Sequence, residues 1–406
     1  MFSEWKYMNA NSLLPKPISD NTKEMEALEN FRPFIKLFAN LTLQPSLLLF
    51  EENSIQRPNN SLQFRLIIKC VFHLIFIIGA IIWTLDDRWG ILYADDYNGQ
   101  ILGALSMIVV FLTHGFSIME ISVSLESISH LWNTFQRIEN LLGEIGCKQL
   151  LKRSLRKCYL KYFIHFFAAV ALYVIAVGTN LYISTLENVK LIHLLLIFNG
   201  SIALTSLRLA LIELHVQILS CYMALINVEL RNILLATEYG KVLKNLKYDY
   251  VNYSKLKKLN NCYVICSNVL DQIKKTFSIS IFWNCLKIKV LILDDIYSII
   301  YQLVRGSLFG ENTMLRVPNK VFFINWINSC DTLFRNQLNI IETINAFNIS
   351  GSDDSLRILV LHLQSTLTHR KFQISSAGMF YVTFGFVMEN IINGLTYVTF
   401  MVQLTK

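Results

Sequence analysis

The sequence predicts an all-α membrane protein with seven transmembrane helices, an inside N-terminus and an outside C-terminus. Of its 406 residues, 53% are hydrophobic and only 16% are charged, and the mean hydropathy is +0.42. A soluble domain carries about 25% charged residues. Apolar stretches near the 20 or so residues that cross a bilayer recur along the chain. The net charge of +8 does not by itself indicate nucleic acid, because basic residues in a membrane protein first reflect topology.

The apolar stretches divide the chain into a cytoplasmic N-terminal segment, 1–65, and a helical bundle, 66–404. The fourth stretch continues as an apolar-periodic helix to about residue 236, and charges interrupt the fifth. The predicted spans are 66–85, 101–125, 162–183, 191–208, 277–304, 321–334 and 380–404. Cytoplasmic helical extensions are predicted between about 209–276 and 335–379.

The distribution of basic residues sets the predicted orientation. The segments 1–65, 126–161, 209–276 and 332–376 hold 27 of the 37 lysines and arginines, and the alternate segments hold 6. The other four lie inside predicted spans: Lys69, Arg208, Lys287 and Lys289. Lys and Arg near spans stay cytoplasmic. The asymmetry therefore predicts that the N-terminus lies inside and the C-terminus outside. The sequons at Asn40 and Asn59 favour an outside N-terminus, but such triplets are common by chance.

Other classes fit less well. A G-protein-coupled receptor with an outside N-terminus is the alternative that the sequons favour, yet neither an Asp-Arg-Tyr nor an Asn-Pro-x-x-Tyr motif is present. A secondary transporter should show internal repeats or paired broken helices, and the sequence shows neither. We expect no enzyme, cofactor or metal site, because phosphate-loop, His-Glu-x-x-His and Gly-x-Ser-x-Gly motifs are absent and the 8 cysteines have no metal-ligand spacing. The first 30 residues contain no apolar signal-peptide core.

A polar stripe runs along the last predicted span. At 100° per residue the stripe residues fall within an arc of about 80° that extends about 20 Å along the helix. They are Glu389, Asn393, Thr396, Phe400 and Gln403. The opposite face is apolar and contains Ile391, Leu395, Val398 and Val402. Polar groups in hydrocarbon need a partner or water. Two interpretations therefore compete: the stripe packs against other helices of the same chain through hydrogen bonds, or it lines a water-filled path between several copies of the chain.

The fifth span contains ionisable residues, Lys287, Lys289, Asp294 and Asp295, which are candidates for function inside a membrane. Together with aromatic and polar groups on the outer halves of nearby spans, the two aspartates suggest a pocket for a cationic small molecule. The alternative is that these charges pair with other helices, or that the lysines reach the interface. The candidate pocket comprises Tyr173, Asn180, Tyr182, His193, Asp294, Asp295, Tyr297, Tyr301 and Trp326.

The C-terminus resembles a known family. Thr396-Tyr397, five mostly apolar residues and Gln403-Leu404 are similar to the TYhhhhhQF signature of insect gustatory receptors. The preceding stretch from Phe372 to Tyr397 resembles the same family, and residues 31–45 (FRPFIKLFANLTLQP) resemble its opening segment more loosely. The final motif position departs from the pattern, with Leu404 in place of Phe.

The resemblance implies a small-molecule-gated, non-selective cation channel, a homo- or hetero-tetramer in the cell membrane of taste neurons, with an aversive tastant somewhat favoured. Each subunit would contribute its last helix to a central pore and hold its ligand within its own bundle. The cytoplasmic ends of spans four to six would pack into an anchoring region. The implied pore-lining residues are Glu389, Asn393, Thr396, Phe400, Gln403 and Leu404. An insect odorant receptor is the alternative within the same superfamily.

Overall fold

A computed structural model describes residues 26–41, 97–187, 189–243, 246–305, 317–347, 354–376 and 379–404, together with 68, 71–73, 75–79 and 82. Half of the first predicted span, 66–85, and most of the N-terminal segment therefore lie outside the described residues. The elements are α1 (Glu26–Asn40), α4 (Tyr97–Val123), α5 (Leu125–Glu144), α6 (Lys148–Glu187), α7 (Val189–Leu243), α8 (Leu246–Thr276), α9 (Ser278–Arg305), α10 (Val317–Asn345), α11 (Asp354–His369), β1 (Ser375–Ser376), β2 (Phe380–Tyr381) and α12 (Phe384–Leu404). The all-helical prediction is confirmed, with one short hairpin added.

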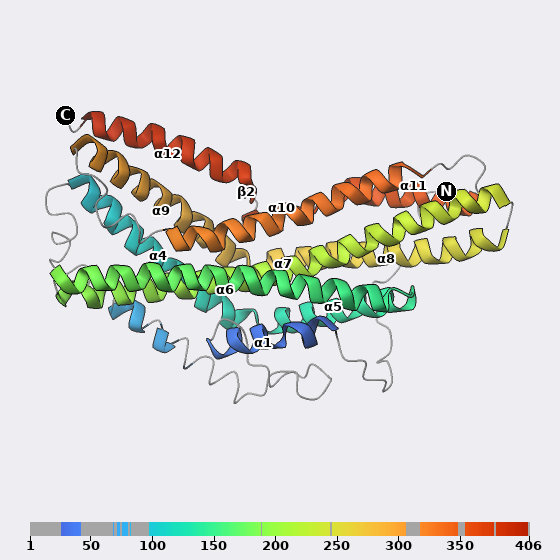
Figure 1. Cartoon of the computed structure of the whole chain (residues 1–406), viewed down its shortest axis with the longest axis horizontal. Coiled ribbons are helices and arrows are strands. Elements are labelled where there is room, and N and C mark those ends of the chain that lie inside the picture. Colours follow the sequence, from blue (N-terminus) through green and yellow to red (C-terminus); the bar gives the residue numbers. More distant parts are fainter. Residues whose placement is uncertain are drawn as a thin grey trace, which may run out of the picture.

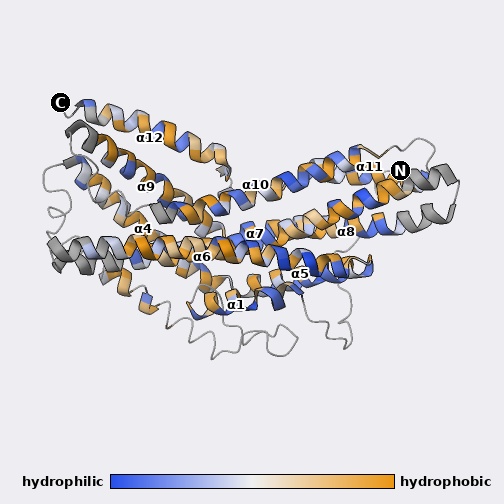
Figure 2. Cartoon of the chain, in the orientation of Figure 1, coloured by the Kyte–Doolittle hydropathy of each residue, from blue (hydrophilic) through white to orange (hydrophobic). Residues whose placement is uncertain are grey.

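The molecule is elongated, and its helices separate into two ends (Figure 1). At one end α4, α9 and α12 fan out beside α6 and α7, and at the other α5, α8 and α11 pack around the long extensions of α6, α7 and α10. Figure 2 shows that α4, α9 and α12 are largely apolar, whereas α5 and α8 mix apolar and polar residues. The first end thus carries the membrane-compatible surface, and the second has the mixed surface of a water-facing helical domain.

Hydropathy and length identify the helices that can cross a bilayer. Three of the described helices contain such a stretch: Asn98–Ile121, Lys148–Thr179 and Phe198–Ala236. The pair Tyr253–Thr276 and Ser278–Ile300 adds a fourth that bends by 65° at its break. Only 17% of the apolar window of α6 is buried, against 89% of that of α7. Helix α7 is therefore the centre of the bundle, and α6 exposes apolar side chains at its periphery.

The predicted spans can be placed on these helices. Spans 101–125, 277–304 and 321–334 correspond to α4, α9 and α10, and the apolar periodicity expected to about residue 236 is the long helix α7, which ends at Leu243. One boundary requires correction. Residues 380–383, the expected start of the last span, form β2 and a bend, and the helix begins at Phe384.

The β1–β2 hairpin redirects the chain into α12. Its antiparallel register pairs Ser375 with Tyr381 and Ser376 with Phe380. The predicted helical extension 335–379 thus ends in a strand instead of a helix. Two-residue strands have no measurable alternation of apolar and polar residues, so hydrophobic periodicity could not have found them.

Helix α1 attaches the N-terminal segment to the bundle through aromatic contacts and one buried carboxylate. The rings of Phe34 and Tyr162 pack edge to face, with their centroids 4.8 Å apart. The Glu139 carboxylate of α5 accepts the first two backbone N–H groups of α1, from Glu26 at 2.8 Å and from Ala27 at 2.9 Å. The Tyr222 hydroxyl donates to the same carboxylate at 2.7 Å. A side chain from another helix therefore satisfies backbone donors that α1 leaves unpaired at its N-terminus.

Burial raises the pKa of Glu139 from 4.5 to about 6, against the lowering effect of its three hydrogen bonds. Because the folded-state pKa lies above the unfolded value, the group's contribution to stability is fully present below about pH 4.5. This contribution is lost as the pH rises through about 6, which lowers the free energy of unfolding by ~2 kcal/mol.

Replacing Glu139 by Gln should therefore flatten the pH dependence of the unfolding temperature between pH 4.5 and 7, because Gln does not ionise. Thermal unfolding of the detergent-purified full chain would measure it. Glu144→Gln, on the exposed surface of the same helix, is the control and should keep the wild-type profile. An unchanged profile in Glu139→Gln would contradict the assignment.

Candidate functional site

The polar stripe of α12 points away from the helices of its own chain. Glu389, Asn393, Thr396 and Gln403 are exposed, and Phe400 is 60% exposed. The Thr396 hydroxyl donates to the Ile392 carbonyl one turn earlier, at 3.0 Å. Within the described part of the chain, no hydrogen bond or ion pair joins the stripe to another helix. Leu404 is helical, but its side chain lies outside the described set, and the role of the stripe in a pore stays a prediction.

The exposed surface of α12 extends well beyond the stripe. Met388, Ile392, Leu395 and Tyr397 are each between 45% and 67% exposed. Figure 1 shows the cause, since α12 lies at the edge of the molecule with α9 on one side. The other helices of the same chain therefore cover only about half of α12, and both its polar stripe and much of its apolar surface are exposed.

The covered face of α12 packs closely against α9. It consists of Asn390, Gly394 and Val398, each one turn apart, and Val398 is fully buried. A Cβ at Gly394 would lie 2.9 Å from Cδ1 of Ile296, which is closer than real Cβ contacts. The missing side chain of Gly394 therefore lets the two helices approach.

Residues of the candidate ligand pocket lie near this contact. Tyr297 of α9 is buried in a cluster with Leu102 of α4 and Val398 of α12. Asp294, one turn earlier on α9, accepts a hydrogen bond from the Ser106 hydroxyl of α4 at 2.8 Å. Asp294 and Tyr297 are thus brought together where α4, α9 and α12 meet.

The other candidate pocket residues are distributed more widely. Asp295 forms an ion pair with Lys320 at the start of α10, so the two adjacent aspartates contact different helices. Trp326 is fully buried in the main core beside Phe323, and Tyr182 is 68% exposed.

Of the remaining candidate pocket residues, Tyr173 forms a hydrogen bond within the bundle, and the side chains of three others are not described. The Tyr173 hydroxyl of α6 donates to the Asn199 carbonyl of α7. The side chains beyond the described ones are Asn180, His193 and Tyr301. The pocket as a whole stays a prediction, with Asp294 and Tyr297 as the two members that share a location next to α12.

Lys287 is fully buried, and its ammonium donates to the Thr205 hydroxyl of α7 at 2.8 Å. Buried charges of this kind tie α9 to the central helix α7. Asp294, seven residues later on α9, accepts a hydrogen bond from Ser106 of α4.

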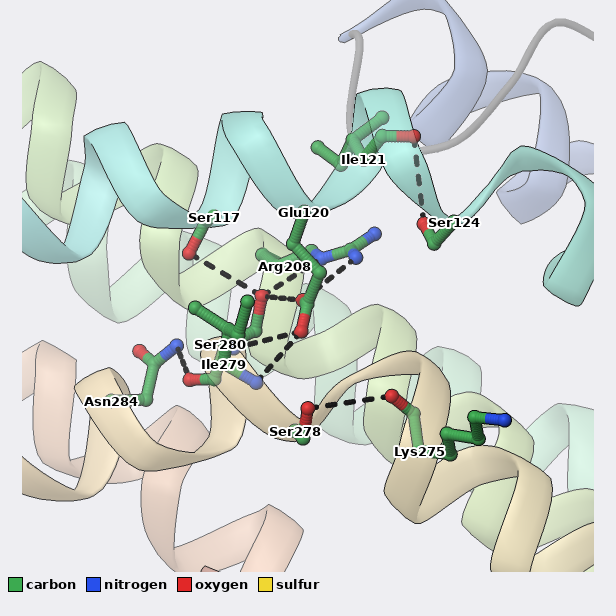
Figure 3. Close-up of polar contacts among 10 residues, drawn as sticks. All are labelled: Ser117, Glu120, Ile121, Ser124, Arg208, Lys275, Ser278, Ile279, Ser280 and Asn284. Carbon is green, nitrogen blue, oxygen red and sulfur yellow. Dashed lines mark hydrogen bonds and ion pairs between the residues drawn. The ribbon is translucent and has the colours of Figure 1, made fainter. Parts of the chain in front are cut away.

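A buried polar cluster sets the start of α9 (Figure 3). The Glu120 carboxylate of α4 accepts the backbone N–H groups of Ile279 at 2.8 Å and Ser280 at 3.1 Å. It also accepts the Ser280 hydroxyl and pairs with the Arg208 guanidinium of α7 at 3.2 Å. The guanidinium lies over the Phe277 ring at 4.8 Å.

The Glu120–Arg208 cluster lies at the bend between α8 and α9. The α8–α9 break falls at Phe277, where the pair bends by 65°. The carboxylate supplies an acceptor for N–H groups at the start of α9 that have no partner within the helix, and its charge is favourable at a helix N-terminus. One side chain thus connects α4, α7 and the membrane end of the bent pair.

A second polar cluster holds the segment that leads into α12. Gln337 of α10 accepts the Phe372 N–H at 2.8 Å through its amide oxygen. Its amide nitrogen donates to the Tyr263 hydroxyl of α8 at 3.1 Å and to the Arg370 carbonyl. The Tyr263 hydroxyl also donates to that carbonyl at 3.2 Å. The chain therefore leaves α11 fixed to α8 and α10 before it forms the hairpin and α12.

Sequence reasoning missed Glu120, Gln337 and Gly394. Arg208 lies inside the predicted span 191–208, but the sequence did not identify its partner. A Glu near the end of one apolar run and an Arg inside another were the available signal, since intramembrane charges usually face partners, but the sequence did not say which.

The fold and the site define a polytopic helical membrane protein whose last helix lies at the edge of its own bundle. Residues 32–405 match the sequence profile of the 7tm Chemosensory receptor family, and the chain belongs to this family. It is therefore a multi-pass membrane protein of the insect chemoreceptor type. No curated protein sequence matches it significantly.

Solved structures show the same fold. The chain is similar to the insect olfactory receptor OR5 from Machilis hrabei, with a TM-score of 0.60 and 13% identity over 94% of this chain and 100% of that one. The same receptor in complex with eugenol gives a TM-score of 0.55 and 13% identity over 93% of this chain and 100% of that one.

Enlarging Gly394 should separate α12 from α9. Gly394→Leu is expected to lower the unfolding temperature, with a cost of about 1–3 kcal/mol for overpacking. Gly178→Leu on α6, where nothing lies within 4 Å of the added Cβ, is the control and should be tolerated. The double variant Gly394→Ala with Ile296→Val removes the clashing Cδ1 and should unfold at or above the temperature of Gly394→Ala alone. Equal effects of the two Leu variants would contradict the close approach.

Removing one member of the buried Glu120–Arg208 pair should be strongly destabilising, because it leaves the other charge uncompensated. Glu120→Gln or Arg208→Met is expected to cost about 3–5 kcal/mol, measured by thermal unfolding and by the yield of monodisperse protein. Lys258→Met, which removes an exposed ion pair with Glu144, is the matched control and should change stability little. A loss no larger than that of the control would show that the cluster does not hold α9.

Proposed function

We propose that the chain is a subunit of a ligand-gated, non-selective cation channel that detects tastants, with its last helix lining the pore. The observation that carries the proposal is the exposure of α12. A polar stripe of Glu389, Asn393, Thr396 and Gln403 runs along a helix whose apolar flanks are also uncovered. Polar groups at this depth require water or a partner. An aqueous path between copies of the chain satisfies the stripe, and lipid or neighbouring subunits cover the flanks.

A single α12 cannot enclose a path, so the proposal requires an assembly. Four copies around an axis, each contributing one helix, are the arrangement that the family resemblance implies. The N-terminus then lies inside and the C-terminus outside, as the basic residues predict. Glu389 would form a ring of negative charge, and rings of carboxylates favour cations. Other receptor chains of the same type could replace some of the four copies.

Gating would begin at a small-molecule pocket near the junction of α4, α9 and α12. Asp294 and Tyr297 lie there, and Tyr297 belongs to the same hydrophobic cluster as Val398 of α12. A ligand that moves Tyr297 would therefore act directly on the pore helix. The similar olfactory receptor was solved with the small molecule eugenol, which is consistent with a small-molecule ligand for this chain. The Asp294 carboxylate favours a basic, aversive compound.

An odorant receptor is the second candidate. It is supported by the likeness to an olfactory receptor in fold. The gustatory assignment is favoured by the C-terminal Thr396-Tyr397…Gln403-Leu404 signature. The ligand class decides between the two, because a taste receptor responds to water-soluble tastants and an odorant receptor to volatile compounds.

Whole-cell recording tests the proposal. The full chain is expressed in a heterologous cell, its surface delivery is confirmed by labelling, and sugars, alkaloids and volatile compounds are applied in turn. A cation current evoked by alkaloids or sugars supports the taste assignment, and one evoked only by volatiles supports the odorant alternative. If the delivered chain is silent both alone and with co-expressed receptors of its family, the channel proposal fails.

Glu389 gives a test of ion selectivity. Glu389→Gln should lower the permeability of divalent relative to monovalent cations several-fold, because the ring of negative charge is lost. Reversal potentials in mixed ionic solutions measure it. Glu342→Gln, an exposed carboxylate on α10, is the control and should leave selectivity unchanged. An unaltered permeability ratio in Glu389→Gln would place this residue away from the ion path.

A further inference from the structure

A cavity of about 400 Å³ lies between α6, α7 and α10, away from the residues of the proposed pore and ligand pocket. Its size lies within the range of small-molecule sites. The lining is rich in hydrogen-bonding groups and contains two lysines one turn apart on α6, Lys157 and Lys161. Their neighbours in the lining include Ser154, Ser220, Thr332 and Asn336.

The cavity has a net positive lining. None of its lining residues is a carboxylate, and neither lysine has an ion-pair partner within the described ranges. Behind the cavity wall, Glu213 accepts hydrogen bonds from the lining residues Gln217 and Ser329 and lies within electrostatic reach of Lys161. Asp331, next to the lining residue Thr332, pairs with Arg335 at 2.8 Å. Two ammonium groups in a lining that itself contains no carboxylate suit an anion, and lysine is a frequent phosphate binder.

The cavity also lies where α6 changes from a water-facing to a lipid-facing helix. Lys161 is the last lysine or arginine of α6, and the chain has no other until Lys190. On the membrane side of the lysines, and on about the same face of α6, exposed apolar side chains follow: Ile164, Leu172 and Ile175, between 48% and 64% exposed. A phospholipid could bind here with its phosphate in the basic cavity and its acyl chains along the adjacent apolar surface.

We propose that this cavity binds the phosphate headgroup of an anionic phospholipid from the leaflet on the basic side of the membrane. Lys157 and Lys161 hold the phosphate, the Ser154 hydroxyl adds a hydrogen bond, and the acyl chains lie along the exposed apolar face of α6. The bound lipid joins α6 to α7 and α10 at the level where the bundle leaves the membrane. The proposal does not depend on channel function.

Binding to the purified full chain in a neutral detergent tests the proposal. The probe is dioctanoyl phosphatidic acid, with dioctanoyl phosphatidylcholine as the zwitterionic comparison and glycerophosphate as the soluble headgroup. Thermophoresis measures the three affinities. Phosphatidic acid should bind most tightly. Lys157→Gln with Lys161→Gln should weaken it by about 10–30-fold, since each basic residue near an anionic lipid surface contributes about 1 kcal/mol.

Matched variants separate a built site from general charge. Lys148→Gln with Arg153→Gln removes the same charge from exposed positions of the same helix that do not line the cavity, and it should bind phosphatidic acid like the wild type. Ser154→Asp keeps both lysines but places a carboxylate in the lining, and it should weaken binding as well. Gel filtration checks that each variant is folded.

Two results would overturn the proposal. Equal losses in the two double variants would mean that binding reflects the overall charge of α6. Glycerophosphate binding as tightly as phosphatidic acid would show a site for soluble phosphates instead of a lipid.

Discussion

The architecture of the membrane end depends on one buried carboxylate. Glu120 accepts the first backbone N–H groups of α9, at Ile279 and Ser280, while it pairs with Arg208 of α7. A buried charge is tolerated only when its hydrogen bonds are complete, and the four donors around Glu120 meet that condition. Because the same contact lies where α8 and α9 bend by 65°, it determines the direction in which α9 enters the membrane part of the bundle.

That direction in turn places α12. The last helix contacts its chain mainly through α9, by a face that contains Gly394 and Val398. The other end of the connection is also fixed, since Gln337 binds the segment before the hairpin. Helix α12 is thus held at its start and along one side, and its remaining surface is exposed. A ligand that shifts α9 would move α12 with it, which makes α9 the proposed link between ligand pocket and pore.

The sequence predicted the large features and missed the small ones for identifiable reasons. Long apolar runs placed α9 at 277–304, within one residue of its observed Ser278–Arg305. The wheel at 100° per residue placed Val398 opposite the polar stripe, and it is buried. Leu395, assigned to the same apolar face, is 45% exposed, because a peripheral helix buries only the narrow face against its neighbour. The partner of Arg208 lies 88 residues earlier, and no local pattern identifies a contact over that distance.

The central claim is that the stripe of α12 faces the ion path and its apolar flank does not. Thr396 and Leu395 are both exposed, yet adjacent positions on a helix point about 100° apart. The most direct measurement is block of the ligand-evoked current by a cationic thiol reagent in Thr396→Cys and Leu395→Cys, with the wild type as the control for native cysteines. The account predicts irreversible block of Thr396→Cys and none of Leu395→Cys. Block of Leu395→Cys alone, or of both to the same extent, would contradict it.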